Sequence, residues 1–162
     1  MKRRARIITL AIVVCGLALL GQPNTSLDKL AGIKTKADMD ALVAKIRRSE
    51  LKGPQALFER EKGQYRIYTS YIENRKGAAD IHNTDDEVFL ILSGSAEVTL
   101  GGDVMDKKVT GENEFRGTLI IGGTTASVGV GDIISIPRGT AHQMNPGTGH
   151  VLYLVIKIIG SH

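Results

Sequence analysis

Short segments rich in β-forming residues, separated by glycine-containing turns, set the strongest limit on how this chain can fold. From residue 56 onward, apolar and polar residues alternate or form compact runs of isoleucine and valine, which is the pattern of β-strands. The predicted strands include residues 65–71, 88–92, 96–100, 132–136 and 151–159. The predicted turns include residues 93–95, 101–103, 122–123, 129–131 and 146–147. Many short strands in a chain with 19 glycines predict an all-β fold, either an antiparallel sandwich or a closed barrel.

One helix is expected ahead of these strands, from about residue 36 to residue 50. Thr35 is followed three residues later by Asp38, which resembles a capping box at a helix start. Apolar residues recur at the i, i+3, i+4 and i+7 spacing of one helix face, at Met39, Leu42, Val43 and Ile46. Gly53-Pro54 is expected to end the helical segment. We expect the apolar stripe to pack against the β-domain or against a second subunit.

The first 21 residues have the layout of a signal peptide. Four basic residues lie within the first six, and residues 7–20 carry no charge, whereas a membrane-spanning helix needs roughly 20 apolar residues. We therefore predict export to the periplasm or the cell exterior, with cleavage near Gly21. The alternative is an uncleaved membrane anchor formed by residues 7–20. Lipid attachment at Cys15 is disfavoured because Val13 and Val14 before it are not small.

Removal of this segment changes the charge balance of the chain. It holds four of the 21 Lys and Arg residues and none of the 17 acidic residues, so the remaining 141 residues are formally neutral. A neutral domain gives no support for a nucleic-acid partner, and no membrane partner is expected beyond the signal segment. The remainder has no cysteine, hence no disulfide or thiolate ligand. Its length predicts an N-terminal extension over 22–55, which carries the helix, and one β-domain over 56–162.

Two short segments, fifty-odd residues apart, carry side chains that bind metals. Asp80 and His82 share one face of a predicted strand because strand side chains alternate. Glu87 opens an apolar run, where a buried carboxylate is unfavourable unless it is paired or bound to a metal. His142 follows a turn that sends the chain back into the β-domain. Two imidazoles and two carboxylates that can converge inside a barrel indicate a divalent metal.

The spacing of these residues resembles the two sequence motifs of the cupin superfamily. The first motif reads G-x5-H-x-H-x4-E-x6-G, and its spacing from the first ligand position onward is kept by Asp80, His82, Glu87 and Gly94. The second reads G-x5-P-x-G-x2-H-x3-N, and its order and spacing are kept by Gly131, Pro137, Gly139 and His142. The resemblance implies a single-domain cupin, an antiparallel β-barrel or jelly roll with a short N-terminal helix. It also implies a homodimer formed through the sheets.

The sequence departs from the cupin motifs at three positions. Asp80 stands where the first histidine is expected, Asn74 stands at the leading glycine, and Asn145 arrives one residue early. The stretch between the motifs is long and rich in glycine, which predicts an extra hairpin around 101–123. Asp80 leaves three roles open. It is a hard oxygen ligand, a partner of a ligand, or an ordinary polar residue near the barrel mouth.

The resemblance implies that His82, Glu87 and His142 bind one divalent metal, Mn, Fe, Zn or Ni, with Asp80 as the candidate fourth ligand. Asp80 and Glu87 are also the candidates for moving a proton in catalysis. The leading interpretation is a metal-dependent enzyme that acts on a small polar molecule, with isomerisation, lyase chemistry and oxidation all open because a fold does not fix a function. The alternative is a noncatalytic cupin that holds a sugar or another small ligand without a functional metal.

Other polar residues are given structural roles. Asp85 and Asp86 are expected to form a solvated turn after His82. Tyr65, Tyr68 and Tyr71 are expected in the strand core or on the surface, and lining of the cavity is the alternative. His150 and His162 match neither motif. The sequence has no phosphate-loop motif, no G-x-S-x-G motif and no CxxC motif.

Overall fold

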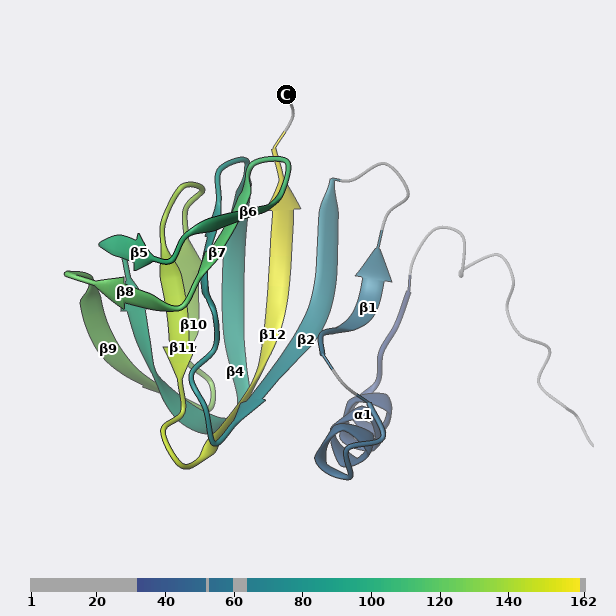
Figure 1. The fold of residues 1–162 in the computed structure, drawn as a ribbon. Helices are drawn as coiled ribbons and strands as arrows, with labels where there is room; N and C mark the ends of the chain where they lie inside the picture. The colour runs from purple at the N-terminus through teal and green to yellow at the C-terminus, as the bar shows by residue number, and fades with distance from the viewer. Residues whose placement is uncertain (1–31, 52, 60–63, 161–162) are drawn as a thin grey trace, which may run out of the picture. The chain divides into compact units, whose positions relative to one another are not determined.

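Figure 1 shows the computed structural model, which describes residues 32–51, 53–59 and 64–160. The predicted signal segment, residues 1–21, lies outside the described residues, as does His162. The described part begins with one helix, α1 (Lys36–Arg47), and continues with strands. The strands are β1 (Gln55–Glu59), β2 (Tyr65–Glu73), β3 (Ala79–His82), β4 (Asp85–Leu100), β5 (Asp103–Met105), β6 (Lys108–Gly111), β7 (Glu114–Gly117), β8 (Leu119–Ile121), β9 (Thr124–Gly129), β10 (Ile133–Ile136), β11 (His142–Asn145) and β12 (His150–Ile159). Among these residues, no helix has the length and apolar character needed to cross a membrane.

The predicted all-β fold, an antiparallel sheet with one short N-terminal helix, is confirmed. The main sheet follows the order β1-β2-β12-β4-β11-β3-β7-β6, and strands β9 and β10 also pair with β4. The sheet curls into a half-barrel, as Figure 1 shows. Strands β5 and β8 form a separate two-stranded sheet.

Strand β4 belongs to both halves of the curled sheet. Its residues 85–94 pair with β12, whereas residues 95–100 pair with β9. The partner changes at Gly94, whose φ of 75° is left-handed, and a Cβ there would lie 1.9 Å from the carbonyl oxygen of His150. The turn predicted at 93–95 is therefore wrong. These residues form a bend inside one long strand, which only glycine permits at this close approach.

Helix α1 begins as predicted but ends earlier. The amide of Asp38 donates to Thr35 Oγ1 at 3.2 Å, and the amide of Thr35 donates to Asp38 Oδ2 at 2.9 Å, which is a complete capping box. The helix stops at Arg47 because Ser49 adopts a left-handed φ of 58°. The amides of Ser49 and Glu50 then donate to the carbonyls of Ile46 and Lys45, respectively, as in a Schellman motif.

The apolar core of the sheet extends to the candidate site, because several of its members also line the cavity there. Alternate residues of β4 are buried, so Glu87 shares a face with Phe89 and Ile91. Strand β12 contributes Val151, Tyr153 and Val155 to the same cluster. The register of β4 therefore places the Glu87 carboxylate inside the core.

The insertion between the two motifs forms the predicted extra hairpin. Strands β6 and β7 pair with each other, and β5 pairs with β8. Strand β7 also pairs with β3, which joins the insertion to the main sheet beside His82. The insertion therefore supplies side chains to the candidate site.

Candidate metal centre

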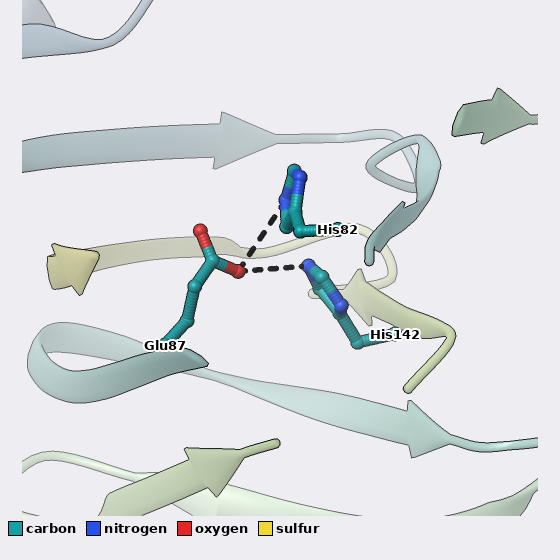
Figure 2. A group of neighbouring side chains, drawn as sticks. All are labelled: His82, Glu87 and His142. Carbon is teal, nitrogen blue, oxygen red and sulfur yellow. Dashed lines mark ion pairs between the residues drawn. The ribbon is translucent and has the colours of Figure 1, made fainter. Parts of the chain in front are cut away.

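Three of the four predicted ligands converge in the described structure. His82 at the end of β3, Glu87 on β4 and His142 at the start of β11 offer ligand atoms that all lie within 4.8 Å of one another. The Glu87 side chain is 2% exposed and that of His142 is 7% exposed. As Figure 2 shows, both imidazoles face one carboxylate oxygen, with His142 Nε2 at 3.2 Å and His82 Nε2 at 3.5 Å from Glu87 Oε2.

The other nitrogen of each imidazole is already engaged. His142 Nδ1 lies 3.1 Å from the carbonyl oxygen of Thr140, which can only accept, so Nδ1 carries the proton. His82 Nδ1 contacts the Glu114 carboxylate, which also accepts. In the neutral imidazoles, both Nε2 atoms therefore direct lone pairs toward Glu87 Oε2. Metal-bound histidines are held in this same manner, with the second ring nitrogen donating to a carbonyl or carboxylate.

Glu87 Oε2 is the atom that tests whether a metal fits this arrangement. It is buried, and no hydrogen bond to it is formed within the described residues when both histidines are neutral. Three electron-pair donors facing one point repel one another unless a cation lies among them. A divalent metal satisfies all three, and two imidazoles with one carboxylate are a ligand set of iron and catalytic zinc sites.

In the metal-free protein a proton on His142 provides part of the positive charge that Glu87 Oε2 requires. Burial by itself would lower the pKa of His142, but the hydrogen bond and charge of Glu87 outweigh it and raise the pKa. Burial by itself would raise the pKa of Glu87, but the hydrogen bond from His142 and the charges of His82, His142 and Lys157 outweigh it and lower the pKa. The site therefore favours a carboxylate next to a cation.

Tyr68 supports the second oxygen of the Glu87 carboxylate. Its hydroxyl donates to Glu87 Oε1 at 3.2 Å. Burial, followed by the charge of Glu87, raises the pKa of Tyr68 well above its usual value, so the phenol keeps its proton. Of the two roles left open for Tyr68, the structure gives it the second, because it lines the cavity and contacts a predicted ligand.

Asp80 lies on the wall of the same cavity but outside the group of three. Arg116 Nε donates to Asp80 Oδ1 at 2.6 Å, and Arg116 Nη2 lies 3.4 Å from Oδ2. Arg116 comes from β7, directly opposite Asp80 in the strand register. The structure therefore gives Asp80 a cationic partner from the protein, and its role as a metal ligand stays a prediction.

Glu114 and Lys157 are site residues that neither motif predicts. Lys157 is 7% exposed, and its Nζ lies 2.7 Å from Glu114 Oε1 and 3.1 Å from Asp85 Oδ2. Asp85 is thus a buried ion-pair partner, so the solvated turn predicted for it is wrong. Asp86 pairs with Arg138 at 2.6 Å. The local sequence carries no signal for these contacts, because they depend on how β7 and β12 lie beside β3 and β4.

A cavity of about 230 Å³ opens onto the three converging residues. Its polar wall residues include Tyr68, Ser70, Tyr153, Arg75 and Arg116. Phe89, Met144 and Val155 provide apolar surface. The cavity is smaller than most drug-sized pockets and fits a molecule with few heavy atoms.

The fold and site define an antiparallel β-domain with an interior group of two histidines and a glutamate, in which the two predicted motifs come together. No family model matches the sequence, and no curated protein matches it. Many of the solved structures that the chain matches are cupin domains.

Three solved structures illustrate the likeness in fold. A protein from Thermus thermophilus is 16% identical over 69% of this chain and 87% of that one, with a TM-score of 0.49. A cupin domain from Schizosaccharomyces pombe is 17% identical over 65% and 63%, with a TM-score of 0.48. A cupin 2 conserved barrel domain protein from Rhodopseudomonas palustris is 15% identical over 68% and 66%, with a TM-score of 0.47. The likeness concerns the fold alone, so the site is argued from this chain's own residues.

Proposed function

We propose that this chain is an exported single-domain cupin that binds one divalent metal at His82, Glu87 and His142 and acts as an enzyme on a small polar molecule. The observation that supports the metal is the convergence of two Nε2 atoms on the buried Glu87 Oε2, with both Nδ1 atoms engaged elsewhere. Mn, Fe, Zn and Ni all accept two imidazoles and one carboxylate. A metal held by these three residues would have further coordination positions for water or for the bound molecule.

When bound, the metal would polarise a carbonyl or carboxylate of the bound molecule or lower the pKa of a bound water. The chain's own residues provide the surroundings. Phe89 and Val155 exclude water from part of the cavity, and the Tyr68 hydroxyl fixes Glu87 in one orientation. Asp80 is the cavity carboxylate outside the converging group, so it is placed to accept a proton from the bound molecule.

The proposal of export rests on residues 1–21, which lie outside the described structure. N-terminal sequencing of protein recovered from the cell exterior or periplasm tests it, with a new terminus near residue 22 as the expected result. An intact residue 1 in the membrane fraction would instead support an anchor formed by residues 7–20.

We also propose a homodimer formed through the sheets, which sedimentation analysis of the purified protein would test.

Metal analysis of protein purified without a histidine tag tests the metal site. We expect about one metal ion per chain in the wild type and a loss of that metal in a His82→Ala/His142→Ala variant. His150→Ala is the matched control, because His150 contacts Arg47 and Ser93 instead of the converging group. Circular dichroism establishes that each variant is folded. Substoichiometric metal that is the same in all three proteins would overturn the metal site and favour a noncatalytic binding cupin.

A further inference from the structure

Strand β7 places an oppositely charged side chain beside each ionisable residue of β3. The register pairs Asp80 with Arg116 and His82 with Glu114. Residues two apart on a strand share one face, so both pairs lie on the same side of the sheet. Both contacts are made, one between Arg116 Nε and Asp80 Oδ1 at 2.6 Å and one between Glu114 and His82 Nδ1.

We propose that β7 sets the number of protein ligands at this metal centre, with Glu114 holding His82 in as a ligand and Arg116 holding Asp80 out. The inference rests on the proposed metal site and goes beyond it, because it assigns a task to the insertion between the motifs. Glu114 and Arg116 are positioning residues, since each acts through the β3 residue beside it.

Glu114 acts on His82 by fixing the position of its ring proton. A carboxylate only accepts hydrogen bonds, so contact with Glu114 keeps the proton on Nδ1 and leaves the Nε2 lone pair for a metal. Glu114 is itself held by Lys157 at 2.7 Å, and Lys157 is held in turn by Asp85 at 3.1 Å. Lys157 Nζ also lies 3.1 Å from His82 Nδ1, so two proton-bearing nitrogens share the Glu114 carboxylate.

Arg116 acts on Asp80 by providing a cation at its carboxylate. Asp80 stands where the motif resemblance places a histidine ligand, and it lines the cavity with the three converging residues. The guanidinium engages both of its oxygens, at 2.6 Å and 3.4 Å, in a forked geometry that favours a carboxylate. If Arg116 is removed, Asp80 loses this cation, and we expect a metal bound by the three converging residues to take Asp80 as a fourth protein ligand.

Cobalt(II) binding to the purified, metal-stripped full chain tests this proposal, because cobalt reports both affinity and ligand number in its visible absorption. We expect Arg116→Leu to raise cobalt affinity about tenfold and to change the absorption spectrum. Loss of a residue that only supports a metal ligand ordinarily lowers metal affinity 10- to 100-fold. A rise in cobalt affinity in Arg116→Leu therefore distinguishes the proposed role of Arg116 from simple support of the site. The double variant Arg116→Leu/Asp80→Asn should restore the wild-type spectrum. Asp80→Asn alone should leave affinity unchanged.

The Glu114 half of the proposal has its own variants. Glu114→Leu should lower cobalt affinity 10- to 100-fold, whereas Glu114→Gln should keep most of it because the amide oxygen still accepts the Nδ1 proton.

Arg48→Leu is the matched control for Arg116→Leu, because it removes an arginine–carboxylate pair of the same 2.6 Å length just beyond α1. We expect it to bind cobalt as the wild type does.

Three outcomes would overturn the inference. They are a tenfold loss of affinity in Asp80→Asn, a wild-type spectrum in Arg116→Leu, and equal affinities for Glu114→Leu and the wild type. Arg116→Gln replaces Arg116→Leu if the latter does not fold. A wild-type chain that binds no cobalt and holds no metal by direct analysis would contradict the proposed function itself, which is a separate result.

Discussion

At the scale of single residues, Glu87 shows why this site requires a partner cation. Its carboxylate lies on the buried face of β4, 2% exposed, between two imidazole nitrogens. A carboxylate in such a position is strongly unfavourable unless it is paired or hydrogen-bonded. Tyr68 satisfies one oxygen, and the other is left for a proton on histidine or for a metal. The same residue therefore links the stability of the barrel to its ligand.

This link predicts how the metal-free protein responds to pH. The pKa of His142 is raised above 6.5, so its contribution to stability is complete below pH 6.5 and is lost as pH rises through the raised value. The pKa of Glu87 is lowered below 4.5, so its contribution is complete above pH 4.5 and is lost as pH falls through the lowered value. Melting temperatures in a chelator should therefore peak between pH 4.5 and pH 6.5.

The metal-loaded protein is the control for this pH profile. A metal binds the unprotonated Nε2, so it should remove the loss of stability above pH 6.5. A His142→Gln variant without metal should also lack that loss. A metal-free wild type whose melting temperature is level from pH 6 to pH 9 would contradict the coupling between His142 and Glu87.

At the scale of elements, local spacing predicted which residues converge and missed the residues that contact them. Asp80 and His82 lie two apart on one strand, and Glu87 follows five residues later, so short-range geometry places them together. Glu114 lies 32 residues from His82, and the β3–β7 pairing that joins them depends on where the inserted hairpin folds back. No periodicity in the sequence reports that pairing.

Two motif positions show how backbone conformation depends on residue type. Gly94 is expected in a turn between strands, yet it bends one continuous strand. Asn74, which replaces the leading motif glycine, has a left-handed φ of 53°, a conformation that asparagine adopts more readily than most residues. Asn74 therefore keeps the left-handed conformation that a glycine at this motif position would allow. The motif comparison alone does not show this.

Alanine substitutions at two motif glycines separate backbone strain from steric contact. Both Gly94 and Gly139 are left-handed, with φ of 75° and 76°, so each substitution should cost about 1–2 kcal/mol. At Gly94 the new Cβ would also lie 1.9 Å from the carbonyl oxygen of His150, whereas at Gly139 no described residue lies within 4 Å of it. We therefore expect Gly94→Ala to cost about 1–3 kcal/mol more than Gly139→Ala. Urea denaturation measures both, and equal losses would contradict the close approach at the β4 bend.

At the scale of the whole molecule, the candidate metal centre connects strands from separate parts of the chain. His82, Glu87 and His142 lie on β3, β4 and β11, and β11 pairs with both of the other strands. The three ligand atoms meet only when these pairings have formed, because the two motifs are separated by the whole insertion. Metal binding at the proposed site would therefore be thermodynamically linked to folding of the β-domain.

This linkage predicts that the metal stabilises the entire β-domain. With free cobalt(II) at about 100 times its dissociation constant, the folded state should gain about 2.7 kcal/mol. For a chain of this length that corresponds to a rise in melting temperature of roughly 5–10 °C. Calorimetry of the wild type with cobalt and with a chelator measures the shift. His150→Ala should show the same rise, and His82→Ala/His142→Ala should show none. An equal rise in the double variant would place the stabilising cobalt elsewhere on the chain.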